Sequence, residues 1–337
     1  MLFPFGMESL QPSDQICDGR YEILKKVGSG GEGAVYLAMD CVLNRKVAIK
    51  KIHAEKKSIG TDASGIPDLE QAQAIMATIE EASRLASLQH PNIVTVYDFI
   101  RQPSGILVIM EFLKGKNIDE LPDPMSLGMF WKFAEQCLQG LSAAHSIGMI
   151  HRDIKPGNII LQETSSDDFQ VKILDFGLAK VIQEPSEQTR DHSGALMGSI
   201  FMMSPEQLRA EPIDFRSDIY SLGCVFYKAF TKEHPFKGAS VPAVITAHLE
   251  HGLTPLTSLR PDLPPTLISW IERLFALDRN DRPASAKVAL EELKSIQAAL
   301  SAPTRRPRKP LPPNIIIHRQ PDSPYVTLEL QSASTAA

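Results

Sequence analysis

Apolar and charged residues alternate over roughly the first hundred positions of the chain, in the manner typical of strands. Short alternating runs follow one another from Tyr21 to Ile49 around a glycine cluster, as expected of an antiparallel meander. Residues 68–88 are rich in Ala, Leu, Glu and Gln and favour a helix, and two more strand-like runs cover 93–97 and 106–110. This part of the chain is expected to form a sheet with one helix.

After Pro124 the hydrophobic spacing changes from two residues to three or four, which is typical of amphipathic helices. The first apolar stripe consists of Phe130, Phe133, Ala134, Cys137, Leu138, Leu141 and Ala144. Further helices are expected at 216–230, 240–251, 266–276 and 284–300. We therefore expect an α+β fold with a small β-rich lobe followed by a larger, mainly α-helical lobe.

The two ends of the chain differ from its middle. Residues 1–19 lack periodicity and are expected to be a flexible leader, with the folded domain over 20–300, divided near residue 113. The segment PTRRPRKPLPP from Pro303 holds five prolines and four basic residues in eleven positions. The tail, 301–337, is expected to be disordered. An extended linker is the simplest interpretation, with a polyproline ligand and a basic anchor as alternatives.

Composition narrows the functional classes. With 337 residues, 43% of them hydrophobic, the chain can bury a sizeable core, and its net charge of −5 gives no indication of a nucleic-acid partner. The four cysteines form no CxxC pair, which argues against a zinc module or a disulfide framework. No apolar stretch approaches the roughly 20 residues that span a bilayer, and no basic signal-peptide region precedes the first apolar run. We expect a cytoplasmic protein without a membrane span.

A glycine-rich run, Gly28 to Val35, has the form GxGxxGxV, in which backbone amides can approach phosphate oxygens closely. Alone it also fits an ordinary tight hairpin. A dinucleotide-binding fold would require a helix after the third glycine, whereas the following residues resemble a strand. Farther along, strand alternation places Ala48 and Lys50 on one face, the face expected toward a bound phosphate.

The segment from His151 to Asn158 combines three chemical groups in one turn-forming loop. Asp153 can orient a hydroxyl nucleophile and accept its proton, and Lys155 can neutralise a transferring phosphoryl group. Asn158 can offer an oxygen to Mg²⁺. A second carboxylate, Asp175, follows a strand-like run beside a glycine. Any one of these motifs could arise by chance, but their joint order and spacing point to phosphoryl transfer.

These motifs together resemble the Hanks-type (eukaryotic-like) Ser/Thr protein kinases, in the style common among bacterial members, over about residues 21–298. The resemblance implies the bilobal protein-kinase fold and transfer of the γ-phosphate of ATP to Ser or Thr hydroxyls of protein substrates. It also implies Mg²⁺, with Mn²⁺ as an alternative, and autophosphorylation in the activation segment, for which a dimer is one arrangement.

The resemblance assigns the chemical roles residue by residue. Asp153 is expected to be the catalytic carboxylate, with Lys155 beside it, and Asn158 and Asp175 to be the metal ligands. Lys50 is expected on the α- and β-phosphates. Its helix partner is expected to be Glu81, nine residues before the His of the HPNIV segment, with Glu80 as the alternative.

The resemblance also implies the nucleotide-binding residues. They comprise the loop over ATP, the apolar walls around adenine, the gatekeeper and two hinge residues that bond adenine through their main chain. In chain order they are Val27, Gly28, Gly30, Gly33, Val35, Ala48, Lys50, Met110 (the gatekeeper), Glu111 and Leu113 (the hinge), Asn158, Ile160 and Asp175.

Beyond the site, the likeness continues through Ser204-Pro205-Glu206, Asp218 and Arg282, and it implies a buried ion pair between Glu206 and Arg282. The spacing from Lys50 to Glu81 is longer than usual and indicates a loop insertion over about 56–70. Gly157 stands where basophilic kinases commonly carry a glutamate, so no strong preference for basic substrates is expected.

Two other functions are compatible with such motifs: a pseudokinase that only binds partners, and a small-molecule phosphotransferase. The complete set of catalytic residues and the long activation segment, Asp175 to Glu206, favour an active protein kinase. Arg152 is expected to pair with a phosphorylated residue of that segment. Ser193 is the favoured site and Ser199 is expected to be structural, with unmodified loop hydroxyls as the alternative; the candidates are Ser186, Thr189, Ser193 and Ser199.

Overall fold

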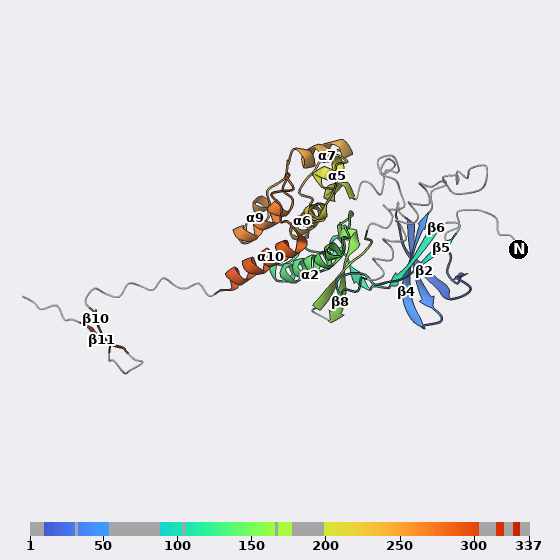
Figure 1. Cartoon of the computed structure of the whole chain (residues 1–337), viewed down its shortest axis with the longest axis horizontal. Coiled ribbons are helices and arrows are strands. Elements are labelled where there is room, and N and C mark those ends of the chain that lie inside the picture. Colours follow the sequence, from blue (N-terminus) through green and yellow to red (C-terminus); the bar gives the residue numbers. More distant parts are fainter. Residues whose placement is uncertain are drawn as a thin grey trace, which may run out of the picture. The chain divides into compact units, whose positions relative to one another are not determined.

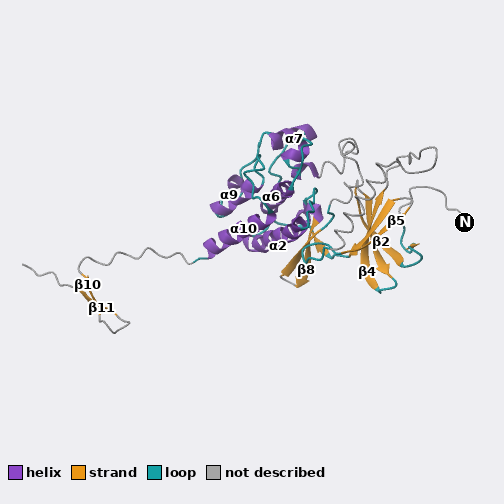
Figure 2. Cartoon of the chain, viewed as in Figure 1, coloured by secondary structure: helices purple, strands orange, loops and turns teal. Residues whose placement is uncertain are grey.

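The computed structural model describes residues 10–30, 33–53, 88–102, 105–165, 168–176, 199–302, 315–319 and 326–330. The chain divides into two compact units, 1–297 and 298–337. The first unit contains a β-sheet lobe and a helical lobe (Figures 1 and 2). The expected α+β class with two lobes is thereby confirmed.

The first lobe is built on a six-stranded antiparallel sheet. The strands are β1 (Gln15–Ile16), β2 (Tyr21–Gly30), β3 (Gly33–Asp40), β4 (Arg45–His53), β5 (Val96–Gln102) and β6 (Gly105–Glu111), in the order β1-β2-β3-β4-β6-β5. Because side chains alternate along a strand, Val47 and Ile49 pack in a small cluster on one face, and Ala48 joins the larger core on the other. Part of the expected leader thus forms β1 and joins this sheet.

The helical lobe is arranged around α6 (Phe215–Thr231), of whose 17 residues 13 are buried. Gly223 allows this packing, because a Cβ there would lie 2.7 Å from the Cβ of Leu274. The helices near it are α2 (Leu127–Ser146), α5 (Pro205–Leu208), α7 (Val241–Leu249), α8 (Leu256–Leu259), α9 (Pro265–Leu274) and α10 (Ala286–Ser301). The short helices η1 (Ile118–Glu120), η2 (Pro156–Asn158) and η3 (Ile200–Met202) connect them.

Serine and aspartate side chains fix where the main helices begin. Ser126 caps α2 by accepting a hydrogen bond from the Met129 N–H, and Asp214 caps α6 in the same way through Arg216. The four helices expected after residue 215 are present, with ends that differ by one or two residues from the prediction. Regular hydrophobic spacing is thus enough to locate the long helices.

A second, three-stranded sheet lies beside α2 and consists of β7 (Gly115–Lys116), β8 (Ile159–Ser165) and β9 (Asp168–Ile173). The backbone of residues 92–94 bonds to β9: the Ile173 N–H donates to the Asn92 carbonyl at 2.9 Å, and the Val94 N–H donates to the Ile173 carbonyl at the same distance. This pairing explains why β5 begins at Val96 instead of near Ile93, as the sequence pattern predicted. It also places Asp175 just beyond the end of β9.

The remaining expectations concern the segment between β4 and β5, the tail and membrane spans. The predicted helix over 68–88 and the insertion over 56–70 lie almost entirely outside the described residues. In the tail, where no regular structure was expected, β10 (Ile315–Arg319) and β11 (Val326–Leu330) form an antiparallel pair. Among the described residues, every helix is too short or too polar to cross a bilayer.

Candidate active site

The buried side chain of Asp218, near the start of α6, fixes the loop that carries Asp153 through hydrogen bonds. The Asp218 carboxylate accepts hydrogen bonds from the backbone N–H groups of His151 at 2.7 Å and Arg152 at 2.8 Å. It also lies 2.9 Å from Nε2 of His145. Arg152 adopts a left-handed backbone conformation, with φ of +66°, and these contacts stabilise that conformation.

Asp153, Lys155 and Asn158 converge, as the sequence predicted. The Lys155 Nζ lies 2.6 Å from Oδ2 of Asp153 and donates to the Ser199 hydroxyl at 3.1 Å. The Asn158 side-chain amide donates to the Asp153 carbonyl at 2.8 Å and to its Oδ2 at 3.1 Å. Because its nitrogen faces Asp153, the amide oxygen of Asn158 points away from that residue. Asp153 is only 8% exposed, so its carboxylate is held in one orientation.

Lys50 and Asp175 meet across the two lobes. The Lys50 Nζ, from β4, lies 2.9 Å from Oδ2 of Asp175, which follows β9. Asp175 has a φ of +54°, and the neighbouring Leu174 N–H donates to the Asn158 carbonyl at 2.8 Å. The residues expected to act on the phosphates are therefore in one place, although they come from three separate segments of the chain.

His151 fixes the backbone between these groups. Its ring accepts a hydrogen bond from the Asp153 N–H at 3.2 Å through Nδ1, and its Nε2 lies 2.7 Å from the Leu174 carbonyl. Its ring also packs on the buried Phe176 ring, with centroids 4.5 Å apart. Burial lowers the pKa of His151, so the ring is neutral at pH 7 and donates from Nε2.

The sheet register places the expected nucleotide-binding residues on one face. Val35 pairs with Lys50 and Met110 pairs with Ala48, so all four side chains point to the side of the larger core. Gly33, which pairs with Gly30 at the end of the hairpin, has a φ of +142°, and a Cβ there would lie 2.0 Å from the Lys51 carbonyl oxygen. A glycine is required at that position.

The remaining predicted binding residues lie in the β2–β3 hairpin, after β6 and on β8. Gly28 pairs with Val35 in the β2–β3 hairpin, and the preceding Val27 is 54% exposed. Ile160 on β8 and Leu113 after β6 are both half-buried. The Glu111 carboxylate forms an ion pair with Lys172 at 2.6 Å, and the expected main-chain bond from Glu111 to adenine stays a prediction.

A family model for the protein kinase domain matches residues 21–293. The chain belongs to the protein kinase family. This kinase chain is 33% identical over 299 residues to the serine/threonine-protein kinase pkn2 of Myxococcus xanthus, covering 87% of this chain and 34% of that protein. It is 30% identical over 280 residues to the serine/threonine-protein kinase PrkC of Bacillus subtilis, covering 82% and 40%. The chain spans about a third to a half of the length of the curated relatives it matches.

Solved kinase structures share the fold. The kinase domain of Mycobacterium tuberculosis PknI superposes with a TM-score of 0.61 at 20% identity, over 86% of this chain and 99% of that one. Rad53 1–466 in complex with AMP-PNP gives a TM-score of 0.64 at 23% identity, over 82% and 65%. The two-lobed arrangement of this kinase domain is therefore that of the family.

The expected ion pair at the base of the kinase domain is confirmed. Two nitrogens of Arg282 lie 2.7 and 3.0 Å from the two carboxylate oxygens of Glu206, which also accepts a hydrogen bond from Ser217 at 2.6 Å. These bonds with Arg282 and Ser217 outweigh the effect of burial and lower the pKa of Glu206 to about 2. The pair anchors the end of the activation segment to the C-terminal part of the lobe.

Several predictions lie outside the described residues. Glu80 and Glu81 are among them, so the pairing of Lys50 with Glu81 stays a prediction. The same holds for Ser186, Thr189 and Ser193. Ser199 is described, and its buried hydroxyl is bonded to Lys155. Among the described residues no three His, Cys, Asp or Glu side chains form a cluster that could hold a metal ion by themselves.

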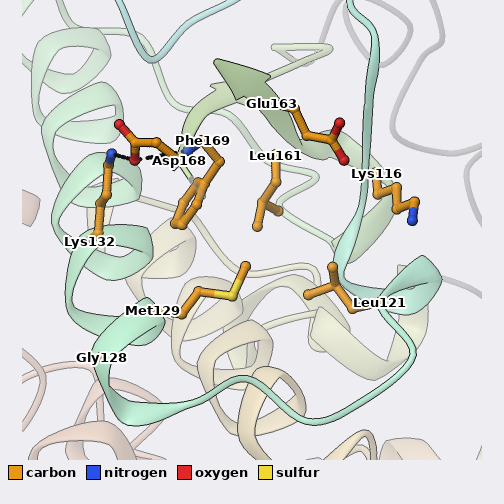
Figure 3. A pocket seen from close by; sticks show the side chains of 9 residues that line it. All are labelled: Lys116, Leu121, Gly128, Met129, Lys132, Leu161, Glu163, Asp168 and Phe169. Atoms are coloured by element: carbon orange, nitrogen blue, oxygen red, sulfur yellow. Dashed lines mark hydrogen bonds and ion pairs between the residues drawn. The ribbon is translucent and has the colours of Figure 1, made fainter. Parts of the chain in front are cut away.

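A separate cavity of about 440 Å³ lies between α2 and the β7-β8-β9 sheet (Figure 3). Apolar side chains form its floor, and Lys132 and Asp168 form an ion pair at one edge. It contains none of the predicted site residues. Its lining residues are Lys116, Leu121, Gly128, Met129, Lys132, Leu161, Glu163, Asp168 and Phe169.

Proposed function

We propose that the chain is a serine/threonine protein kinase that transfers the γ-phosphate of ATP to Ser or Thr hydroxyls of proteins. The observation that carries this proposal is the contact of Asp153 with Lys155 and Asn158, next to the Lys50–Asp175 pair. Two carboxylates, two ammonium groups and an amide in this arrangement suit a reaction that depends on positioning and charge neutralisation. Relatives named serine/threonine-protein kinases, at 30–33% identity, support the acceptor class.

ATP would lie between the β2–β3 hairpin and β8. Its adenine would be covered by Val35, Ala48 and Ile160, and its phosphates by the glycine-rich hairpin. The shared face of Val35, Ala48, Lys50 and Met110 supports this position. The main chain at Leu113 and the Glu111 carbonyl remain the proposed partners of adenine, because the Glu111 N–H already donates to the Thr95 carbonyl.

Asn158 and Asp175 would hold Mg²⁺, with Mn²⁺ as the alternative. Carboxylate and amide oxygens are the donors these ions prefer, and the Asn158 amide oxygen faces away from Asp153, as a ligand at this position requires. When bound, the ion neutralises charge that develops on the phosphate oxygens.

In the proposed reaction, the substrate hydroxyl oxygen forms a bond to the γ-phosphorus while the bond from that phosphorus to the bridging oxygen of ADP breaks. Asp153 orients the hydroxyl and receives its proton. Lys155, fixed by Asp153 and by the Ser199 hydroxyl, neutralises the transferring phosphoryl group. Lys50 acts on the non-transferring phosphates, in contact with Asp175.

A pseudokinase is not favoured, because Lys50, Asp153, Asn158 and Asp175 are all present and three of their contacts are formed. Autophosphorylation at Ser193, a dimer that would support it and a cytoplasmic location stay predictions.

Transfer from γ-labelled ATP to a generic protein substrate tests the proposal. Phosphoamino-acid analysis should recover label on Ser or Thr, and Asp153→Asn should abolish the transfer. Label recovered only on tyrosine, or on a small-molecule acceptor, would contradict it.

A further inference from the structure

A partly buried ion pair that takes no part in the proposed chemistry joins β6 to β9. Nζ of Lys172 lies 2.6 Å from Oε1 of Glu111, the last residue of β6, and the two side chains are 9% and 20% exposed. Lys172 lies on a strand between two apolar residues, Val171 and Ile173. Its ammonium group is expected to pair with a carboxylate, because an isolated buried charge costs several kcal/mol.

The backbone of residues 93–95 completes this contact. The Thr95 N–H donates to Oε1 of Glu111 at 2.7 Å, and Nζ of Lys172 donates to the Ile93 carbonyl at 3.3 Å. The Glu111 N–H in turn donates to the Thr95 carbonyl at 2.9 Å. Side chain and main chain of Glu111 are thus both fixed to the same short segment.

The lysine end of the pair belongs to the helical lobe. The Val171 N–H, next to Lys172, donates to Oε1 of Gln136 on α2 at 2.7 Å, so β9 is fastened to the longest helix of that lobe. The same Gln136 oxygen accepts a hydrogen bond from the Asn92 side chain at 2.8 Å. The Lys172–Glu111 contact therefore connects an element of the sheet lobe to one of the helical lobe.

The pair lies at the adenine end of the proposed ATP site. Lys172 pairs in register with Ile160, so the two side chains share a face of the β8–β9 ladder. Glu111 directly follows Met110 and lies two positions before Leu113. Lys172, on β9, precedes Asp175 by three positions. Loss of the Lys172–Glu111 contact would change the position of the residues that cover adenine relative to β9, the strand that precedes Asp175.

Stability alone gives a weak reason for such a pair, because apolar residues of similar volume often serve as well or better in a buried position. The pair instead restricts geometry, because an ion pair with two further hydrogen-bonding partners, the Thr95 N–H and the Ile93 carbonyl, allows fewer arrangements than an apolar contact. We propose that Lys172 and Glu111 form an interlobe clamp that sets the spacing of the adenine site and thereby the affinity for ATP. Both are positioning residues, and the proposal rests on the proposed function.

The test compares Lys172→Met, Glu111→Gln and the double variant with the unaltered protein, with Lys172→Arg as the conservative change. Lys237→Met, which removes an exposed pair with Glu233, is the matched control. Each single variant should raise KM for ATP roughly tenfold and change kcat less than about twofold. The double variant should resemble the single variants, because one contact is lost in all three. Lys172→Arg should keep most of the affinity.

A merely structural pair would give a different result. In that case the single variants would unfold at lower temperature yet bind ATP as the unaltered protein does. That result, or an ATP affinity that rises when the pair is removed, would overturn the clamp. The uncharged double variant leaves no buried charge without a partner, so it provides a folded sample if a single variant fails to fold.

A titration with a fluorescent ATP analogue keeps the two proposals apart, since it requires no phosphate transfer. If the unaltered protein binds the analogue but transfers no phosphate, the proposed function fails. The dissociation constants of the Lys172 and Glu111 variants would still decide whether the clamp exists.

Discussion

The carboxylate of Asp218 accepts a hydrogen bond from the backbone N–H of His151 at 2.7 Å, and this contact joins the buried helix α6 to the loop that carries Asp153. A second bond, from the Arg152 N–H at 2.8 Å, fixes the residue with a left-handed backbone. The position of the proposed catalytic carboxylate therefore depends on a side chain that belongs to the core of the helical lobe.

Replacing Asp218 with Ala should weaken both the fold and the catalysis. Two backbone N–H groups would lose their acceptor, which should lower the free energy of unfolding by about 2–4 kcal/mol. The loop would no longer be held, so kcat should fall at least roughly tenfold. Urea unfolding and steady-state kinetics measure the two effects, with Asp262→Ala at an exposed pair as the control. Normal kcat in the folded variant would show that the loop holds its own conformation.

Glu206 should make the protein sensitive to acid. Its pKa is lowered to about 2 from the usual 4.5, so its contribution to stability is present above pH 4.5 and is lost as the pH falls toward 2. The loss amounts to about 3 kcal/mol over that window. Unfolding curves between pH 5 and 3 should show a steeper decline for the unaltered protein than for Glu206→Gln. Parallel declines would mean that the carboxylate gains nothing from Arg282.

His248 should contribute acid sensitivity at higher pH. Burial, with smaller effects of His234 and His251, lowers its pKa to about 3, and its Nδ1 lies 2.7 Å from the Tyr220 hydroxyl. Between pH 6.5 and about 3 this histidine is protonated in the unfolded chain but not in the folded protein. The free energy of unfolding therefore falls by about 1.4 kcal/mol for each pH unit below 6.5. Unfolding free energies at pH 7, 6 and 5 should fall less steeply in His248→Gln. An unchanged slope would contradict the neutral ring.

The hydroxyl of Ser199 should matter through Lys155. Ser199→Ala removes the acceptor at 3.1 Å from Nζ and leaves Lys155 held by Asp153 alone, which should lower kcat roughly tenfold with little change in KM for ATP. Ser199→Thr keeps a hydroxyl and should retain most activity. Equal activity of the alanine and threonine variants would remove Ser199 from the positioning network.

Sequence reasoning could identify much of the site because its groups are chemically distinctive and locally spaced. Asp153, Lys155 and Asn158 lie within one loop, and the structure places the side chains of Lys155 and Asn158 within hydrogen-bonding distance of Asp153. The strand alternation around Lys50 and the position of Asp175 after a strand were equally local signals. That the last two side chains meet at 2.9 Å follows only from the packing of the lobes.

Contacts between segments that are far apart in the chain could not be predicted from the sequence pattern. The bonds from Asp218 to the loop amides involve backbone groups, which carry no side-chain pattern. Lys172 was visible only as a charge inside an apolar strand, and nothing in the sequence named Glu111 as its partner. The β10–β11 pair was missed because a proline-rich segment precedes these short runs of apolar residues.

The most direct test of the account compares kcat and nucleotide affinity in Asp153→Asn. Asn keeps the size of the side chain, and Asp153 lies outside the residues proposed to bind adenine. We predict that phosphate transfer falls at least about a thousandfold while the affinity for ATP stays within about twofold. Substantial transfer by a folded Asp153→Asn protein would contradict the central claim that this carboxylate positions the attacking hydroxyl.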